Sequence, residues 1–191
     1  SERLLLPVII EKLEEAEPDT PKLSSQYMTV MEVGGAYAHI FFELLDFLEL
    51  RCLIITDLDS VAAAGGVACA VHQGTATSNA CLKAWFAGGD CSLTGLLAKT
   101  DAEKVKNRQR IAFQRPEVDS GPCGRTLEDA FMLANPALFA VAGNTSNEKE
   151  LSTRELAAKI KKSDFALKYA IDEKGWATPG YIFDGVKWLA E

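Results

Sequence analysis

The stretch Arg51-Cys-Leu-Ile-Ile-Thr-Asp57-Leu-Asp59-Ser60 decides the fold expected for this chain. Its first half is a short apolar run, typical of a strand that is buried on both faces of a parallel sheet. Its second half places two carboxylates at the carboxyl end of that strand, where open α/β sheets bind ligands. Asp57 and Asp59 are two residues apart, so an extended backbone points both side chains to the same side. The stretch therefore predicts a buried strand that presents a pair of carboxylates.

A pair of carboxylates favours a hard cation. Two anionic groups held close together repel each other unless such an ion lies between them, and oxygen ligands of this kind suit Mg²⁺. Asp57 and Asp59 are therefore candidate metal ligands, and the Ser60 hydroxyl is a further candidate. The alternative is structural, because Asp is common in turns and Ser commonly caps a helix.

The residues before this stretch extend the pattern. Residues 28–33 form a second apolar run, closed by Gly34-Gly35, and residues 37–50 are apolar at helical spacing. Strand, glycine turn, helix and strand make a βαβ unit, which predicts a parallel sheet. Glu32 lies within the first of these strands and is either a carboxylate at the sheet edge or a further member of the site.

The remaining pattern divides the chain into two parts. We expect an α/β core over residues 1–120, with an inserted segment after the Asp57-Leu-Asp59 strand, and a mainly helical part over residues 121–191 that completes the site. The sequence favours helices at 1–15, 80–86, 126–134, 147–170 and 181–190, and short strands at 67–71 and 111–114.

Composition excludes several classes of protein. The chain has 191 residues, a net charge of −7 and 48% hydrophobic residues, which argues against disorder. It has no apolar run long enough to cross a membrane and no signal-peptide pattern at its start. Five cysteines without CxxC spacing and only two histidines argue against a disulfide scaffold or a zinc site. We therefore expect a cytoplasmic protein with reduced thiols and no membrane partner.

One basic stretch is a candidate DNA contact. The acidic net charge argues against DNA binding by the whole surface, but a local patch can still contact phosphates. Four basic residues alternate along residues 104–110 and would share one side of an extended segment. The alternative is an ordinary solvated surface. The candidates are Lys104, Lys106, Arg108 and Arg110, to which Arg115 and Arg125 would add.

Five short motifs, taken in order, give the chain a family resemblance. It resembles the Toprim nuclease domain of the OLD (overcoming lysogenization defect) family, which in that family lies C-terminal to an ATPase. The first motif, Ser1-Glu2-Arg-Leu-Leu-Leu-Pro7, is similar to the end of the family's opening motif. The others lie at residues 29–45, 53–60, 124–131 and 161–167, so the resemblance spans most of the chain.

The resemblance implies a Toprim (Rossmann-like) fold, with a small parallel sheet flanked by helices. It implies a DNA nuclease that uses two Mg²⁺ or Mn²⁺ ions, in phage defence or DNA repair. By this resemblance the metal ligands are Glu2, Asp57, Asp59 and Glu128, with Ser60 as a further candidate. Lys162 is the candidate for the cation that stabilises the transition state, and Lys161 and Lys168 compete with it. The alternative for Glu128, which stands beside Asp129, is an ordinary exposed glutamate on a helix. The alternative for each of these lysines is likewise a solvated helix face.

The chain departs from the family pattern in two places. The first Glu of the opening motif, with its strand, would come before Ser1. The family's ATPase is not expected in this sequence, because the sequence contains no G-x-x-x-x-G-K-[ST] motif. The resemblance implies three partners, namely DNA, that ATPase domain and a helicase. ATP would therefore act only through that domain.

Two other functions fit the same residues. In phosphatases of the haloacid dehalogenase type, Asp57 would be the nucleophile and Asp59 the general acid. In that fold the Asp-x-Asp strand typically opens the chain, whereas here a helix and a strand–helix unit precede it. The second alternative is a catalytically silent module that binds DNA or a protein partner.

Overall fold

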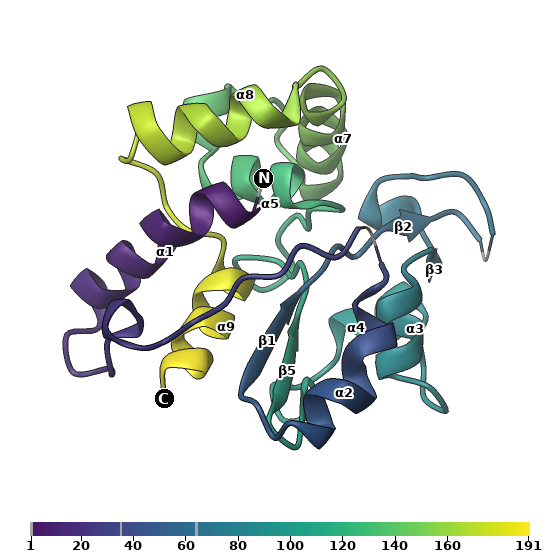
Figure 1. Cartoon of the computed structure of the whole chain (residues 1–191). Coiled ribbons are helices and arrows are strands. Elements are labelled where there is room, and N and C mark those ends of the chain that lie inside the picture. The colour runs from purple at the N-terminus through teal and green to yellow at the C-terminus, as the bar shows by residue number, and fades with distance from the viewer. Residues whose placement is uncertain (1, 35, 64) are drawn as a thin grey trace.

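The structure is a computed structural model that describes residues 2–34, 36–63 and 65–191. Its main sheet has the order β1-β5-β4 (Figure 1). β1 (Cys52–Ile55) is parallel to β5 (Gln109–Ala112), and β4 (Val105–Lys106) is antiparallel to β5. β2 (Ser60–Val61) and β3 (Ala76–Thr77) form a separate antiparallel pair. The α/β class is confirmed, but the sheet is mixed rather than wholly parallel.

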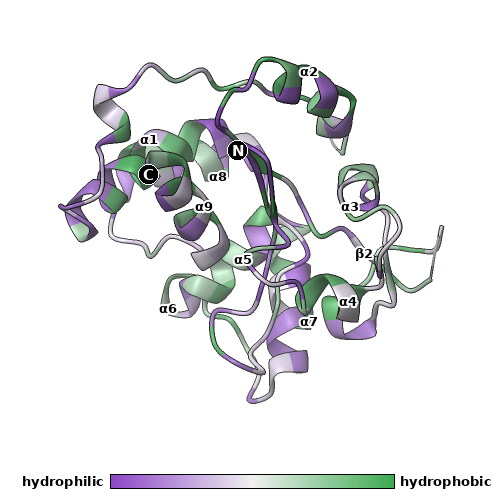
Figure 2. Cartoon of the chain, turned by 90° about the horizontal axis from the view of Figure 1, so that it is seen from below, coloured by the Kyte–Doolittle hydropathy of each residue, from purple (hydrophilic) through white to green (hydrophobic). Residues whose placement is uncertain are grey.

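Helices cover both faces of this sheet. In Figures 1 and 2, α1 and α9 lie on one side of it, and α2, α3 and α4 lie on the other. The helices are α1 (Glu2–Ala16), α2 (Phe42–Phe47), α3 (Ala80–Trp85), α4 (Leu93–Leu97), α5 (Leu127–Ala134), α6 (Pro136–Phe139), α7 (Ser146–Ala157), α8 (Lys162–Leu167) and α9 (Gly180–Ala190). Short helical turns lie at Leu23–Ser25, Ala38–Phe41, Val71–Gln73 and Lys168–Asp172. No described helix is both long and apolar enough to span a bilayer.

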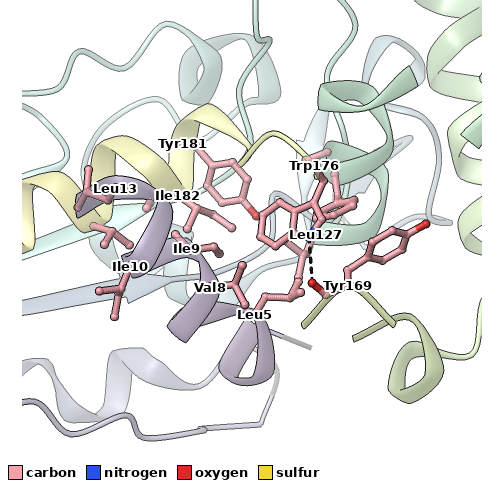
Figure 3. Packing of buried hydrophobic residues seen from close by; sticks show 14 of the residues in the cluster. Leu5, Val8, Ile9, Ile10, Leu13, Leu127, Tyr169, Trp176, Tyr181 and Ile182 are labelled. Carbon is pink, nitrogen blue, oxygen red and sulfur yellow. Dashed lines mark hydrogen bonds between the residues drawn. The ribbon is translucent and has the colours of Figure 1, made fainter. Parts of the chain in front are cut away.

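The alternation of side chains along β1 divides the core in two. Leu53 and Ile55 pack against one buried cluster, whereas Ile54 belongs to the other. The first cluster lies between α1, α5, α8 and α9 (Figure 3), and the second lies beneath α3 and α4. α9 approaches β1 closely, because a Cβ on Gly185 would lie 2.9 Å from the Leu53 side chain. β1 is thus held from both faces, which fixes the position of its carboxyl end.

Several predicted elements are confirmed and others are wrong. The predicted helices at 1–15, 80–86, 126–134 and 181–190 and the strand within 51–56 are present, and the helix within 37–50 is present in shortened form. The strand predicted at 67–71 is reduced to a single bridge at Ala68, and β5 begins and ends two residues before the predicted 111–114. The helix predicted at 147–170 is broken between α7 and α8, where Lys161 has extended backbone angles.

The strand predicted at residues 28–33 is the largest error. This segment has no strand in the structure, and the side chains of Met28, Val30 and Met31 are exposed. A strand requires a hydrogen-bonded neighbour, and no described strand pairs with this segment. The βαβ unit was therefore a wrong prediction, and parallel pairing comes from the distant β5 instead. Gly35, half of the predicted glycine turn, lies outside the described residues.

Candidate active site

Asp57 lies two residues beyond the end of β1 and is fixed by two donors. Its Oδ1 accepts hydrogen bonds from Gln114 Nε2 at 2.7 Å and from the Leu127 backbone N–H at 3.0 Å. Leu127 is the first residue of α5, so the carboxylate faces the positive end of a helix. Both donors bind the same oxygen, Oδ1. The orientation of Asp57 is therefore set by the segment that follows β5 and by the first residue of α5.

The pKa of Asp57 shows that other acids surround it. This pKa is raised from 3.8 to about 7, chiefly by burial and also by the carboxylates of Glu2, Asp59 and Glu128, against the lowering effect of the Gln114 hydrogen bond. These three acids come from α1, the loop between β1 and β2, and α5. The fold therefore places the other three predicted carboxylates within electrostatic reach of Asp57.

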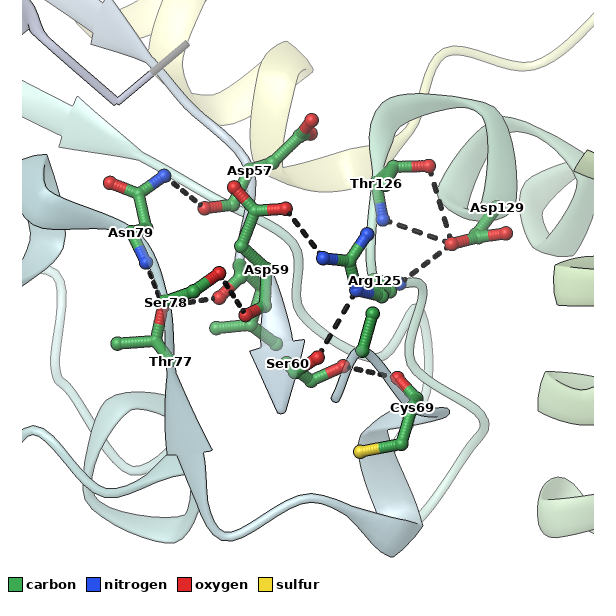
Figure 4. Close-up of polar contacts among 12 residues, drawn as sticks. Asp57, Asp59, Ser60, Cys69, Thr77, Ser78, Asn79, Arg125, Thr126 and Asp129 are labelled. Carbon is green, nitrogen blue, oxygen red and sulfur yellow. Dashed lines mark hydrogen bonds and ion pairs between the residues drawn. The ribbon is translucent and has the colours of Figure 1, made fainter. Parts of the chain in front are cut away.

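Asp59 is held by Arg125. Asp59 has a left-handed backbone (φ 49°), and its Oδ1 lies 2.9 Å from a guanidinium nitrogen of Arg125 (Figure 4). Arg125 Nε also donates to the Ser60 carbonyl at 3.1 Å, and the Asp59 N–H donates to the Arg125 carbonyl at 3.2 Å. Arg125, predicted to contact DNA, thus lies at the acidic cluster. The buried Ser60 hydroxyl donates to the Cys69 carbonyl at 2.7 Å, which links the site to the inserted segment.

A second cation meets the cluster at Glu128. This residue is 3% exposed on α5, and its Oε2 lies 3.2 Å from Lys162 Nζ at the start of α8. Partial burial opposes the charge of Lys162, but Glu128 and then Asp57 and Glu2 raise its pKa overall. Lys161 and Lys168 pair instead with Asp164 and Glu173. Of the three candidate lysines, Lys162 is the one whose ion pair involves a predicted site carboxylate.

The neighbouring Asp129 has a different role from Glu128. Its Oδ2 accepts from the backbone N–H groups of Arg125 and Thr126, at 3.1 and 3.0 Å, and so caps α5 (Figure 4). This capping box fixes the start of the helix. It therefore holds Arg125, Leu127 and Glu128 in their positions around Asp57.

Two amides outside the predicted set of site residues support the site. Gln114, with no exposed surface, accepts from the Leu58 N–H at 2.5 Å and donates to both Asp57 and the Tyr181 hydroxyl, the latter at 3.1 Å. Asn79 donates to the Asp57 carbonyl at 2.7 Å and caps α3 by accepting from Leu82. Gln114 stands at the end of an apolar run, as Asp57 does. That shared position at one sheet edge is the signal that could have identified it.

The basic stretch at residues 104–110 does not form one exposed ribbon. Arg110 is buried and pairs with Asp101 at 3.0 Å, and Lys104 pairs with the same carboxylate at 3.7 Å. Lys106 donates to the Trp85 carbonyl and lies over its ring, while Arg108 is exposed in the turn before β5. Only part of the stretch is therefore available to a phosphate backbone.

Two observations define what the cluster lacks. Glu32, which the sequence offers as a further member of the site, instead pairs with Arg3 at 3.8 Å on the surface. Within residues 2–34, 36–63 and 65–191, no three acidic, His or Cys side chains are already arranged as a metal centre. The ion pairs of Arg125 and Lys162 engage two of the four carboxylates, so a metal ion would have to compete with these cations.

A comparison with known protein families matches the first part of the chain. Residues 1–59 match the family model described as overcoming lysogenization defect protein-like, TOPRIM domain. The match supports an OLD-family Toprim domain. Such a domain is of the metal-binding nuclease and primase type, and the match includes Glu2, Asp57 and Asp59 but ends before Glu128 and Lys162. No curated protein and no solved structure matches the chain significantly.

Proposed function

We propose that the chain is the nuclease domain of an OLD-type protein and cleaves DNA phosphodiester bonds with bound Mg²⁺ or Mn²⁺. One observation carries this proposal. Asp57, at the carboxyl end of β1, has its pKa raised to about 7 by burial and by three neighbouring carboxylates. Such repulsion is costly for a folded protein, and a divalent cation would relieve it.

The donor chemistry of the cluster fits such an ion. Asp57, Asp59, Glu128 and Glu2 would hold it, because all four offer hard carboxylate oxygens. The Ser60 hydroxyl is less suited to ligation, because the side chain is fully buried and is held at the Cys69 carbonyl. When bound, two such ions would activate a water and neutralise the phosphate and the leaving oxygen.

The chain's own cations would then act on the substrate. Arg125 and Lys162 now pair with Asp59 and Glu128, which are the carboxylates that a metal would engage. Once those carboxylates bind metal, both side chains would be available to a phosphate, Arg125 through two N–H groups and Lys162 as a point charge. Lys162 extends from a largely exposed position, which suits contact with a substrate from outside.

DNA is the proposed substrate, and an N-terminal ATPase and a helicase are the proposed partners. The net charge of −7 opposes DNA binding by most of the surface. Contact would therefore concentrate at the cations of the site and at Lys106 and Arg108. Lys104 and Arg110 would contribute less, because Asp101 already neutralises them.

A plasmid-nicking assay tests this proposal. The wild type and Asp59→Asn are compared in Mg²⁺, in Mn²⁺ and in chelator, with Asp172→Asn as a matched control on an exposed acid of the Lys168–Asp172 turn. Asn tolerates the left-handed backbone at position 59, so the variant should fold. We expect metal-dependent nicking that Asp59→Asn lowers at least about a hundredfold and the control leaves unchanged.

Other outcomes lead to different conclusions. Nicking that survives Asp59→Asn would place the reaction elsewhere. An aspartyl-phosphate on Asp57, trapped with beryllium fluoride, would indicate the phosphatase mechanism instead. Metal-dependent DNA binding without cleavage would indicate the catalytically silent module.

A further inference from the structure

Exposed apolar side chains concentrate in one segment of the chain. Of the sixteen large hydrophobic residues exposed in the described structure, ten lie within residues 27–50. Five of these, which we call the α2 stripe, follow each other at helical spacing through the Ala38–Phe41 turn and α2. Contiguous apolar surface of this kind marks interaction sites. The α2 stripe consists of Tyr37, Ile40, Leu44, Phe47 and Leu48, which are 48–82% exposed.

The opposite face of α2 is fixed to the protein. Phe42 packs edge-on against Trp85 with ring centroids 5.3 Å apart, and its carbonyl accepts from Gln109 at 3.0 Å. Asp46 accepts from Asn107 at 2.7 Å, which ties the end of the helix to the turn between β4 and β5. The helix, which lies at the edge of the fold (Figure 2), is therefore docked through these contacts, whereas the side chains of the α2 stripe are exposed. A docked helix presents such a stripe as a preformed surface.

The charge around the α2 stripe identifies the kind of partner. Residues 27–50 contain four acidic residues and no Lys or Arg. In the part of the chain that is described, no ion pair involves Glu43, Asp46 or Glu49. A symmetric contact with a second copy would bring these acids against their own equivalents. Basic residues on the partner would instead meet complementary charge.

We propose that the α2 stripe is a docking site for an amphipathic helix of a protein partner, with an apolar face bordered by Lys and Arg. The partner's apolar side chains would cover Ile40, Leu44 and Phe47, as in helix–groove recognition. Its basic residues would face Glu43 and Glu49. This surface is separate from the carboxylate cluster, so the proposal does not depend on nuclease activity.

Two synthetic peptides test the proposal on the full 191-residue chain. One is an amphipathic helix of Leu and Lys, and the other has the same pattern with Glu in place of Lys. We expect the chain to bind the Leu–Lys helix and not the Leu–Glu helix, as measured by fluorescence anisotropy. Leu44→Ser with Phe47→Ser should weaken binding at least about tenfold without changing net charge. The matched control, Leu167→Ser with Ile171→Ser, alters exposed apolar residues elsewhere and should change little.

A charge reversal makes the test sharper. Glu43→Lys with Glu49→Lys should transfer preference to the Leu–Glu helix, whereas Glu155→Lys with Asp172→Lys, which changes net charge equally, should not. Near-UV circular dichroism checks that each variant is folded. The proposal would be overturned if the Leu–Lys helix did not bind. It would also be overturned if each control double variant changed peptide binding as much as the corresponding α2 variant. Concentration-dependent dimerisation that Phe47→Ser abolishes would assign the surface to a second copy instead.

Discussion

Two regions of this molecule are rich in acids, and the fold treats them in opposite ways. At the carboxyl end of β1, Asp57 is held by two N–H donors, Asp59 by Arg125 and Glu128 by Lys162. On α2, the acidic side chains border exposed apolar residues and take part in no ion pair among the described residues. In the first region the charged groups are buried or partly buried and held in place. Burying charges lowers the stability of a folded protein, and such groups are typical of functional sites. The second leaves its surface uncovered.

This contrast matches the two proposals made above, a reaction site at the carboxylates and a docking surface on α2. A reaction site needs side chains that are already oriented, because misplacement is costly in rate. A docking surface needs apolar area and a distinctive charge pattern, and its side chains become ordered when the partner binds. The predictions below compare residues of the two regions, or of the site and its surroundings.

The largest effect is expected from Asp57→Asn. In the folded protein the pKa of Asp57 is about 7, against 3.8 for the free group. Between these pH values the folded state binds more protons than the unfolded state, so its stability falls as pH rises through the window. A shift of about three pKa units corresponds to about 4 kcal/mol. Asp57→Asn should therefore match the wild type near pH 4 and exceed its free energy of unfolding at pH 8 by up to about 4 kcal/mol.

Urea unfolding at both pH values measures this difference. Glu43→Gln on α2 is the matched control and should change the free energy of unfolding by less than about 0.5 kcal/mol, because that acid is exposed. Mg²⁺ at pH 8 should stabilise the wild type more than Asp57→Asn, because the metal would bind the ionised carboxylate. If the difference in free energy of unfolding between Asp57→Asn and the wild type did not change with pH, the raised pKa of Asp57 would be contradicted.

A smaller effect is expected from Gln114→Leu. This change leaves the buried Leu58 N–H without its acceptor and removes a donor from Asp57. The loss of such a buried partner costs about 1–3 kcal/mol, whereas Gln73→Leu at an exposed position should cost less than about 0.5 kcal/mol. Urea unfolding measures both. Metal affinity, followed by calorimetry, should fall about 10–100-fold with Gln114→Leu, as is typical when support behind a ligand is lost. Equal effects of the two variants would show that Gln114 does not position Asp57.

The different outcomes for these residues show what the sequence could predict. Asp57 and Asp59 follow an uninterrupted apolar run, so their place at a sheet edge could be inferred from local pattern alone. Gln114, Asn79 and Arg125 reach the site through pairing and packing between segments far apart in the chain. No local pattern encodes such contacts. The site lysine could be narrowed to three candidates, and the break before α8 decides which of them meets Glu128.

The strand predicted at residues 28–33 is wrong for a different reason, because here a local pattern is present but the pairing it requires is not. Alternating apolar residues predict a strand only if a neighbouring strand accepts its hydrogen bonds. In the described structure none does, and the same apolar residues become exposed surface. The helix that its spacing predicts at residues 37–50 is present in shortened form, but most of the apolar positions that predict it are exposed. Spacing gives the face of a helix and does not say whether another element covers it.

Lys162→Met should have a moderate effect on stability. Its partner Glu128 is buried, but the lysine itself is largely exposed, so the ion pair is partly screened by solvent. We expect a loss of about 1 kcal/mol in the free energy of unfolding, because one cation is removed from a buried carboxylate. Lys161→Met, next to it, removes a pair with the exposed Asp164 and should cost less than about 0.5 kcal/mol. Urea unfolding at low salt measures both, and equal losses would argue that Lys162 has no special relation to the site.

The smallest effect is expected from Phe47→Ser on α2. This side chain is 82% exposed, so its removal should change the free energy of unfolding of the isolated chain by no more than about 0.5 kcal/mol. Phe42→Ser, on the docked face of the same helix, should cost about 2–4 kcal/mol because it removes the contact with Trp85. Thermal and urea unfolding distinguish the two. A large loss from Phe47→Ser would mean that α2 is covered within the chain. The apolar stripe would then belong to the core, and the contrast between the two acidic regions would disappear.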